Sequence, residues 1–125
     1  MVGHGLVALG LCAALIAMPA FAKVVKGTPQ KDKLVGGAKN DTINGKAGND
    51  KLSARRGSDL LKGGEGNDLV IGGKGFDDLR GGTGDDTIRA RDGEPDIVEC
   101  GDGFDTVVVD ETEDGVFDCE EIQEP

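Results

Sequence analysis

The sequence predicts an all-β fold in which one chain winds into a parallel solenoid. The first observation is a nine-residue phrase that runs six times without a break from Gly36 to Arg89. The second is that one column of the phrase is always Asp and another, two residues later, is always a large aliphatic residue. A fixed short period is typical of solenoids, in which each repeat packs only on its neighbours.

The repeats share a register in which glycine usually stands first, Asp sixth and an aliphatic residue eighth. They begin at Gly27, Gly36, Gly45, Ala54, Gly63, Gly72 and Gly81. The sixth positions are Asp32, Asp41, Asp50, Asp59, Asp68, Asp77 and Asp86. The eighth positions are Leu34, Ile43, Leu52, Leu61, Val70, Leu79 and Ile88. We expect a short strand at positions seven to nine with the eighth side chain inward, preceded by a glycine-rich turn. Two repeats then make one coil of 18 residues.

The repeat loses its phase after Arg89. The segment DGEPDIV carries one extra residue, and CGDGFDTVV then resumes the pattern with Asp105 sixth and Val107 eighth. Val98 and Val116 are expected to point inward as well. The sequence therefore predicts a repeat region at 23–89 and an acidic C-terminal cap at 90–125 that continues the coil.

The N-terminal segment differs in composition from the rest. Residues 1–22 contain no Asp, Glu, Lys or Arg, and an apolar run from Leu6 to Ile16 is followed by Ala20-Phe21-Ala22. This order predicts a secretory signal peptide that is cleaved after Ala22, and hence a secreted, extracellular protein. A retained membrane anchor is the alternative, but the apolar run is shorter than the ~20 residues that span a bilayer. The mature chain would begin at Lys23 and contain no membrane span.

Two cysteines remain after the predicted cleavage, Cys100 and Cys119. An even count in a small secreted domain predicts a disulfide. A metal-binding thiol pair is the alternative, but no third Cys and no His follows Lys23 to complete a zinc site.

Charge is distributed unevenly along the chain. The net charge is −10, yet residues 23–91 hold all 14 Lys and Arg residues, and residues 92–125 hold acids and no base. An acidic tail repels phosphate, and no Tyr or Trp is available for base stacking. Nucleic acid is therefore not an expected partner.

The turns GGEGND, GGKGFD and GGTGDD carry a family resemblance. They resemble the haemolysin-type calcium-binding (RTX) nonapeptide repeats over about residues 27–110, and the acidic, cysteine-bearing C-terminus is similar to that of small secreted bacterial members. The resemblance implies a parallel β-roll in which calcium ions lie between turn n and turn n+2. The ligands would be the Asp carboxylates and turn carbonyls, the hard oxygen donors that calcium prefers.

In a two-sided roll, alternate turns lie on the same edge. Edge one holds the turns that begin at 27, 45, 63, 81 and 100, and edge two those at 36, 54, 72 and 90. The best expected sites pair Asp50 with Asp68 and Asp68 with Asp86. Edge two should bind more weakly, because Arg55 and Arg56 repel a cation there. The full expected ligand set is Asp32, Asp41, Asp50, Asp59, Asp68, Asp77, Asp86, Asp105, Gly45, Ala47, Gly63, Gly64, Glu65, Gly66, Gly72, Gly73, Gly75, Gly81, Gly82, Thr83 and Gly84.

The expected core is one aliphatic side chain wide. We therefore expect the chain to be largely disordered without calcium and to fold on binding it. Residues 110–121 also match an EF-hand loop at six positions, but a strand-like segment precedes them and only four residues follow Glu121. An isolated calcium loop is one alternative there, and an acidic cap is the default.

No catalytic machinery is expected. After Lys23 the chain has no His or Tyr, and its only serines, Ser53 and Ser58, have no plausible base nearby. Calcium binding by a secreted repeat protein is thus the predicted function. A calcium-dependent structural or cell-surface adhesion protein is the alternative, and a fragmentary relative of a toxin is the least favoured, because such toxins lack an N-terminal signal. The sequence indicates no protein or glycan partner.

Overall fold

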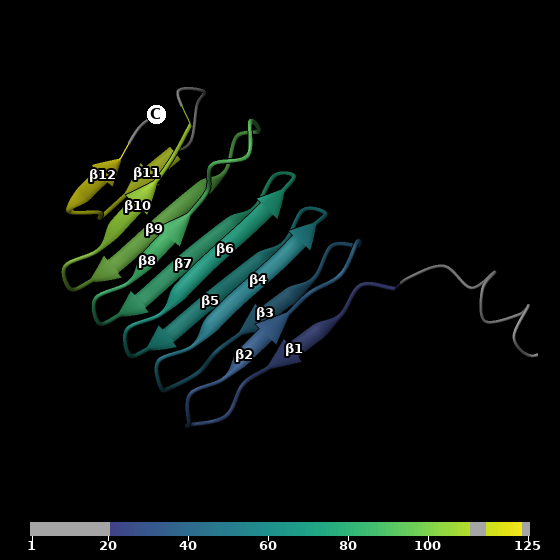
Figure 1. Ribbon diagram of the computed structural model, residues 1–125, viewed down its shortest axis with the longest axis horizontal. Coiled ribbons are helices and arrows are strands. Elements are labelled where there is room, and N and C mark those ends of the chain that lie inside the picture. Colours follow the sequence, from purple (N-terminus) through teal and green to yellow (C-terminus); the bar gives the residue numbers. More distant parts are fainter. Residues whose placement is uncertain (1–20, 111–114, 124–125) are drawn as a thin grey trace, which may run out of the picture.

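The chain winds between two parallel sheets that face each other across a narrow core (Figure 1). This is a computed structural model, which describes residues 21–110 and 115–123. The predicted signal peptide lies almost wholly outside the described residues. Within them, no helix is long and apolar enough to span a membrane.

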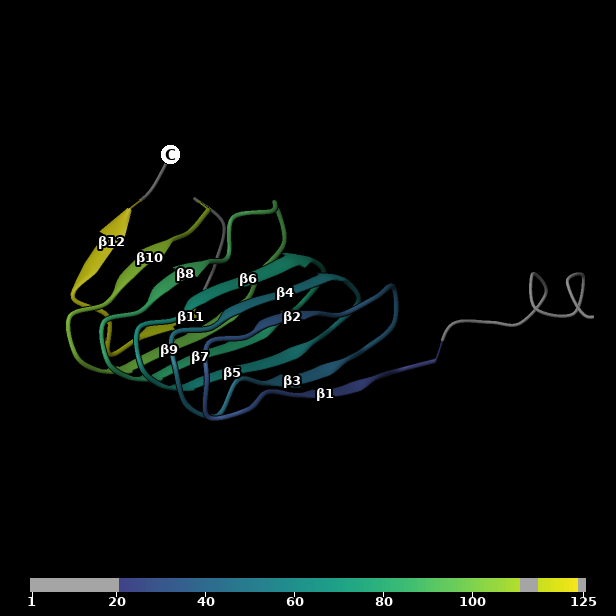
Figure 2. The same ribbon diagram turned by 60° about the horizontal axis from the view of Figure 1, so that its bottom comes forward.

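Each sheet contains six strands, and the chain alternates between the two sheets. The first sheet is formed by β1 (Val24–Lys26), β3 (Thr42–Asn44), β5 (Leu60–Glu65), β7 (Asp78–Thr83), β9 (Ile97–Asp102) and β11 (Gly115–Phe117). The second is formed by β2 (Lys33–Val35), β4 (Lys51–Arg56), β6 (Leu69–Lys74), β8 (Thr87–Arg89), β10 (Thr106–Val108) and β12 (Glu121–Gln123). Figure 2 shows the coils stacked from β1 to β12. The predicted parallel solenoid is confirmed.

The spacing of paired residues measures the coil. Leu61 of β5 lies beside Ile43 of β3 and Leu79 of β7, in both cases 18 residues away. Val98 lies beside Leu79 at a distance of 19 residues, because the turn before β9 contains the extra residue. The strands return to register after that turn, so the insertion is confined to the loop.

The core consists of three inward columns of the repeat. The aliphatic residues at position eight are fully buried from Ile43 to Val107, whereas Leu34 and Val116, in the end coils, are partly buried against them. Position one also points inward, and where it is not glycine it is Ala54, Ala90, Cys100 or Val109. The third column is Asp at position six, only 2–3% exposed from Asp41 to Asp96. A carboxylate column beside an aliphatic column is unusual, since ionised groups are rarely buried without a partner.

Three features differ from the sequence-based expectation. The strands β4, β5, β6, β7 and β9 are six residues long, because they extend through positions one to three of the next repeat. The strand β1 precedes the first recognised repeat. The last turn, Asp118–Glu120, is also shorter than the other turns on its edge.

Candidate metal-binding turns

The turns lie on two edges, as the coil length predicted. Edge-one turns lead from the first sheet to the second, and edge-two turns lead back. Position-six Asp residues therefore form two columns. Edge one contains Asp32, Asp50, Asp68, Asp86 and Asp105, and edge two contains Asp41, Asp59, Asp77 and Asp96.

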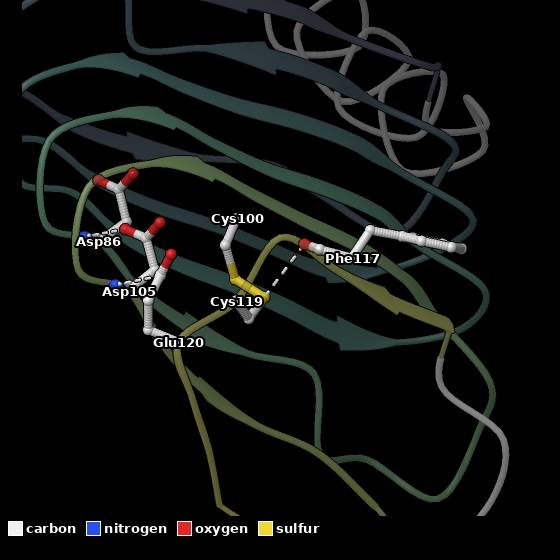
Figure 3. Close-up of a disulfide and its surroundings, with 6 residues drawn as sticks. All are labelled: Asp86, Cys100, Asp105, Phe117, Cys119 and Glu120. Atoms are coloured by element: carbon white, nitrogen blue, oxygen red, sulfur yellow. Dashed lines mark hydrogen bonds between the residues drawn. A yellow bond between two sulfur atoms is a disulfide. The ribbon is translucent and has the colours of Figure 1, made fainter.

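A hydrogen-bond ladder joins the carboxylates of each column. On edge one, the amide of Asp50 donates to Oδ1 of Asp68 over 2.8 Å, and the amide of Asp68 donates to Oδ1 of Asp86 over 2.8 Å. The ladder continues through Asp105 to the Oε2 of Glu120, as Figure 3 shows. The best predicted pairs are thus brought together.

Edge two has the same ladder. The amide of Asp41 donates to Oδ1 of Asp59 over 2.6 Å, and the amide of Asp59 donates to Oδ1 of Asp77 over 2.9 Å. The side chains of Arg55 and Arg56 are exposed and do not interrupt this column. Whether edge two binds a cation more weakly therefore depends on charge and not on a broken ladder.

The second oxygen of these carboxylates is the unusual atom. Oδ2 is buried and has no hydrogen-bond partner within the described chain in Asp50, Asp59, Asp68, Asp77, Asp86 and Asp105. A buried carboxylate oxygen without a partner costs free energy and calls for an explanation such as a missing ion. The same atom recurs in successive turns, so a local packing fault does not account for it.

Backbone oxygens surround this atom. A methyl group placed on Gly63 would lie 2.6 Å from Oδ2 of Asp68 and 2.6 Å from the carbonyl oxygen of Gly81. The same construction on Gly45 meets Oδ2 of Asp50 at 2.5 Å and the carbonyl oxygen of Gly63 at 2.6 Å. Glycine at position one therefore leaves room in which a carboxylate oxygen and a carbonyl oxygen of the next turn converge.

A second column of carbonyls runs along the turn tips. The carbonyl oxygens of Lys46 and Gly64 point at the α-carbons of Gly64 and Gly82, so closely that no side chain fits there. Gly64 and Gly82 also have positive φ, which glycine adopts without strain. The position-three residues of edge one, Ala47, Glu65 and Thr83, lie on the rim of these turns rather than inside them.

Burial shifts the titration of the carboxyl groups. Desolvation raises the pKa of Asp68 to about 6, although the amide of Asp50 acts in the opposite direction, and repulsion from Asp50 adds to the rise. Desolvation likewise raises the pKa of Asp77 and Asp86 to about 7. The pKa values of Asp50, Asp59 and Asp105 are raised for the same reason. A column of such groups favours either protons or an added cation.

The donor set fits a hard cation and not a soft one. No group of three or more His, Cys, Asp or Glu side chains that could hold a metal forms within the described residues. A site here must therefore combine carboxylates with backbone carbonyls, which is the oxygen-rich set that calcium takes. The residues present fit calcium.

A family comparison agrees with this geometry. The model of the RTX calcium-binding nonapeptide repeat matches four copies, at residues 27–61, 47–79, 62–96 and 71–107. The chain belongs to the RTX calcium-binding repeat family. The matched RTX copies contain most of both carboxylate columns, including Asp96, and end before the disulfide. Searches of curated proteins and of solved structures found no match.

Sequence reasoning missed Asp96 as a member of the RTX ladder. Its Oδ1 accepts the amide of Asp77 over 2.8 Å, and its side chain is 3% exposed. The triplet Asp96-Ile97-Val98 repeats the Asp-x-aliphatic spacing and would have identified it, had the extra residue been assigned to the preceding turn.

The predicted disulfide is confirmed. Cys100 and Cys119 are bonded, with their α-carbons 5.1 Å apart (Figure 3). Cys100 stands at position one of its turn and is fully buried, so the bond joins the core of one coil to the short final turn. The EF-hand-like loop lies partly outside the described residues. The described strands β10, β11 and β12 are the elements around it, and they are not the helices of an EF-hand.

Proposed function

We propose that this chain is a secreted calcium-binding protein that folds when calcium binds between successive turns of the roll. The observation that carries the proposal is the column of buried Oδ2 atoms without hydrogen-bond partners, repeated on both edges. A divalent cation between turns would supply the missing positive partner to each of them.

The residues that would hold calcium come from two turns at a time. Between the turns at 45 and 63, the carboxylates of Asp50 and Asp68 and the carbonyl of Gly63 line the space. Between the turns at 63 and 81, Asp68, Asp86 and the carbonyl of Gly81 do the same. Each Oδ1 stays bonded to a backbone amide, which orients the carboxylate, and each Oδ2 is left to meet the ion.

Folding and binding are coupled in this proposal because the apo roll buries a column of like charges. Repulsion along the column and the desolvation of each carboxylate oppose folding, whereas a bound ion that is absent from the unfolded chain stabilises the fold by mass action. The roll offers no third contribution large enough to replace the ion, since its core is one aliphatic column wide.

The test is a titration of residues 23–125 with calcium. Circular dichroism should show a largely disordered chain in EDTA and a β-rich spectrum in millimolar calcium, and isothermal titration should give a stoichiometry above one. A spectrum that is β-rich and unchanged between EDTA and calcium at neutral pH would refute the folding proposal. An absence of binding heat and of any spectral change would refute calcium binding itself.

No catalytic role is proposed. The buried carboxylates face the interior of the roll, and the described residues after Lys23 include no His or Tyr that could act as a base. Secretion is part of the proposal and is tested by the N-terminal sequence of the protein recovered from culture medium, which should begin at Lys23.

A further inference from the structure

The two ends of the roll present strands that are paired on one side only. The strands β1 and β2 are the first in their sheets, and β11 and β12 are the last, so they lie at opposite ends of the stack (Figures 1 and 2). Within the described residues, no other strand lacks a second neighbour. Unpaired edges of this kind are templates for pairing with another chain.

The ends also expose apolar side chains. Val24 of β1 is 70% exposed, Phe117 of β11 is 57% exposed, and Ile122 of β12 is 50% exposed. Leu34 of β2 is partly buried, whereas the equivalent Leu52 one coil inward is fully buried. Each end is therefore an incomplete layer of the core.

The two ends carry opposite charges. The β1 and β2 end has the exposed lysines Lys23, Lys26, Lys31 and Lys33. The β11 and β12 end has the exposed acids Asp118, Glu120 and Glu121. The single salt bridge among the described residues joins Arg80 to Asp78, so these end charges are not paired within the chain.

We propose that the acidic end of one copy, in the chain that begins at Lys23, binds the basic end of the next copy. In this arrangement β12 lies beside β2 of the neighbouring copy and β11 lies beside β1. Continuing the observed register places Glu121 beside Lys33, and Ile122 beside Leu34. It also places the ring of Phe117 beside Lys26. These pairs match charge with charge and apolar surface with apolar surface.

The hydrogen-bond pattern continues across the same junction. Inside the roll, the amide of Lys51 donates to the carbonyl of Asp32, and the amide of Glu121 donates to the carbonyl of Asp105. By the same rule, the amide of Lys33 would donate to the carbonyl of Glu120 in the neighbouring copy. Asp32 is bonded by its own turn, through Thr28, where later members of the column are bonded by the preceding turn.

The charge arrangement selects head-to-tail contact. Lysine on an edge strand usually prevents pairing, and it does so here for two basic ends, which repel each other. Two acidic ends repel in the same way. A basic end against an acidic end attracts, and because the two surfaces differ, the contact does not close on itself and each copy can add another.

Sedimentation velocity tests the proposal on the folded chain from Lys23, in whichever condition circular dichroism shows it folded. The average mass should rise with protein concentration. Lys33→Glu should weaken the association about fivefold, because it sets two acids side by side, and Glu121→Lys should do the same with two lysines. The double variant, Lys33→Glu with Glu121→Lys, should restore it.

The matched control is Lys51→Glu, which makes the same charge change in the same column one coil inward. It should leave the association unchanged. A folded chain that stays monomeric at millimolar concentration would overturn the proposal. A double variant that associates no better than the single variants would overturn the head-to-tail register, as would an equal loss in Lys51→Glu.

Discussion

The amide of Asp68 donates to Oδ1 of Asp86 over 2.8 Å, and Oδ2 of the same Asp86 carboxylate is buried with no hydrogen-bond partner in the described chain. One oxygen thus serves the backbone and the other is available to an ion. This division of roles recurs in both columns and is the basis of the predictions that follow.

Replacing Asp68 should damage calcium binding more than replacing its exposed neighbour on edge one. Asp68→Asn keeps an oxygen that can accept the amide of Asp50 but removes the charge, so we expect calcium affinity to fall by at least the ~10-fold found for residues that only orient ligands. Asp85→Asn is the control, because Asp85 is exposed and its Oδ1 only accepts the amide of Phe104. Isothermal titration measures both. Equal losses in the two variants would contradict the assigned role of Asp68.

The apo protein should be more stable in acid than at neutral pH. The folded-state pKa of Asp68 is about 6 and those of Asp77 and Asp86 are about 7, all above the ordinary value of 3.8. Raised pKa values mean that the folded state binds more protons, so this contribution is complete below about pH 4 and is lost as the pH rises through 6 to 7. Circular dichroism in EDTA should therefore show β structure appearing on acidification. A spectrum that is independent of pH would contradict this.

Calcium affinity should change in the opposite direction with pH. Calcium binds the ionised carboxylate, so protons compete with it wherever the apo pKa is high. Affinity should rise from pH 5 to pH 8, with most of the change near the pKa values of about 6 to 7. Titrations at several pH values measure it, and a flat profile would show that the raised carboxyl groups are not ligands.

Two glycines with the same backbone strain separate sterics from conformation. Gly64 has φ of 95° and its α-carbon faces the carbonyl of Lys46, whereas Gly93 has φ of 90° and has no atom within 4 Å of the added methyl group. Gly93→Ala should cost only the roughly 1–2 kcal/mol of a left-handed residue. Gly64→Ala should cost clearly more and should also weaken calcium binding. Urea unfolding in calcium compares the two, and similar losses would contradict the close approach of the turns.

Arg55 should be a source of strain that can be removed. Its φ is 81°, at the turn position where Gly73 has φ of 90°. Arg55→Gly should stabilise the calcium-bound fold by about 1 kcal/mol and should strengthen binding at edge two, because a positive charge is also removed. Arg91→Gly is the control, since Arg91 occupies the corresponding place in the cap without a positive φ. A loss of stability in Arg55→Gly would contradict the strain.

Reduction of the disulfide should loosen the last coil. The bond between Cys100 and Cys119 closes a loop whose entropy contribution is about 3 kcal/mol on the chain-entropy model. Hydrogen exchange after reduction should be faster in β11 and β12 than in β5 and β6. Uniform acceleration along the whole roll, or none, would contradict a local role.

The sequence predicted the parts of this structure that repeat without exception. Asp at position six and an aliphatic at position eight are side-chain signals, and both columns are inward as expected. The inward direction of position one was not predicted, because it is usually glycine and has no side chain to show a preference. Cys100 and Val109 reveal it only in the structure.

The ladders could not be foreseen for a different reason. A repeat shows that Asp68 and Asp86 are neighbours, but not which carboxylate oxygen takes the amide and which is left over. That depends on the backbone of the turn, and positive φ at Arg55 shows that the turn keeps its shape even where glycine is replaced. Asp96 was missed because an inserted residue changes the spacing from 18 to 19.

A second ladder, formed by position five, has the reverse direction. The amide of Asn67 donates to Oδ1 of Asn49, in the preceding coil, whereas the amide of Asp50 donates to Asp68, in the following coil. Each coil corner therefore reaches both neighbours through two adjacent residues of different chemistry. A slip of one residue would set an exposed side chain in the place of a buried carboxylate and break both ladders at every rung. Insertions and deletions can thus accumulate in this protein only within turns, as the spacings of 19 residues before Asp96 and 15 residues before Glu120 already demonstrate.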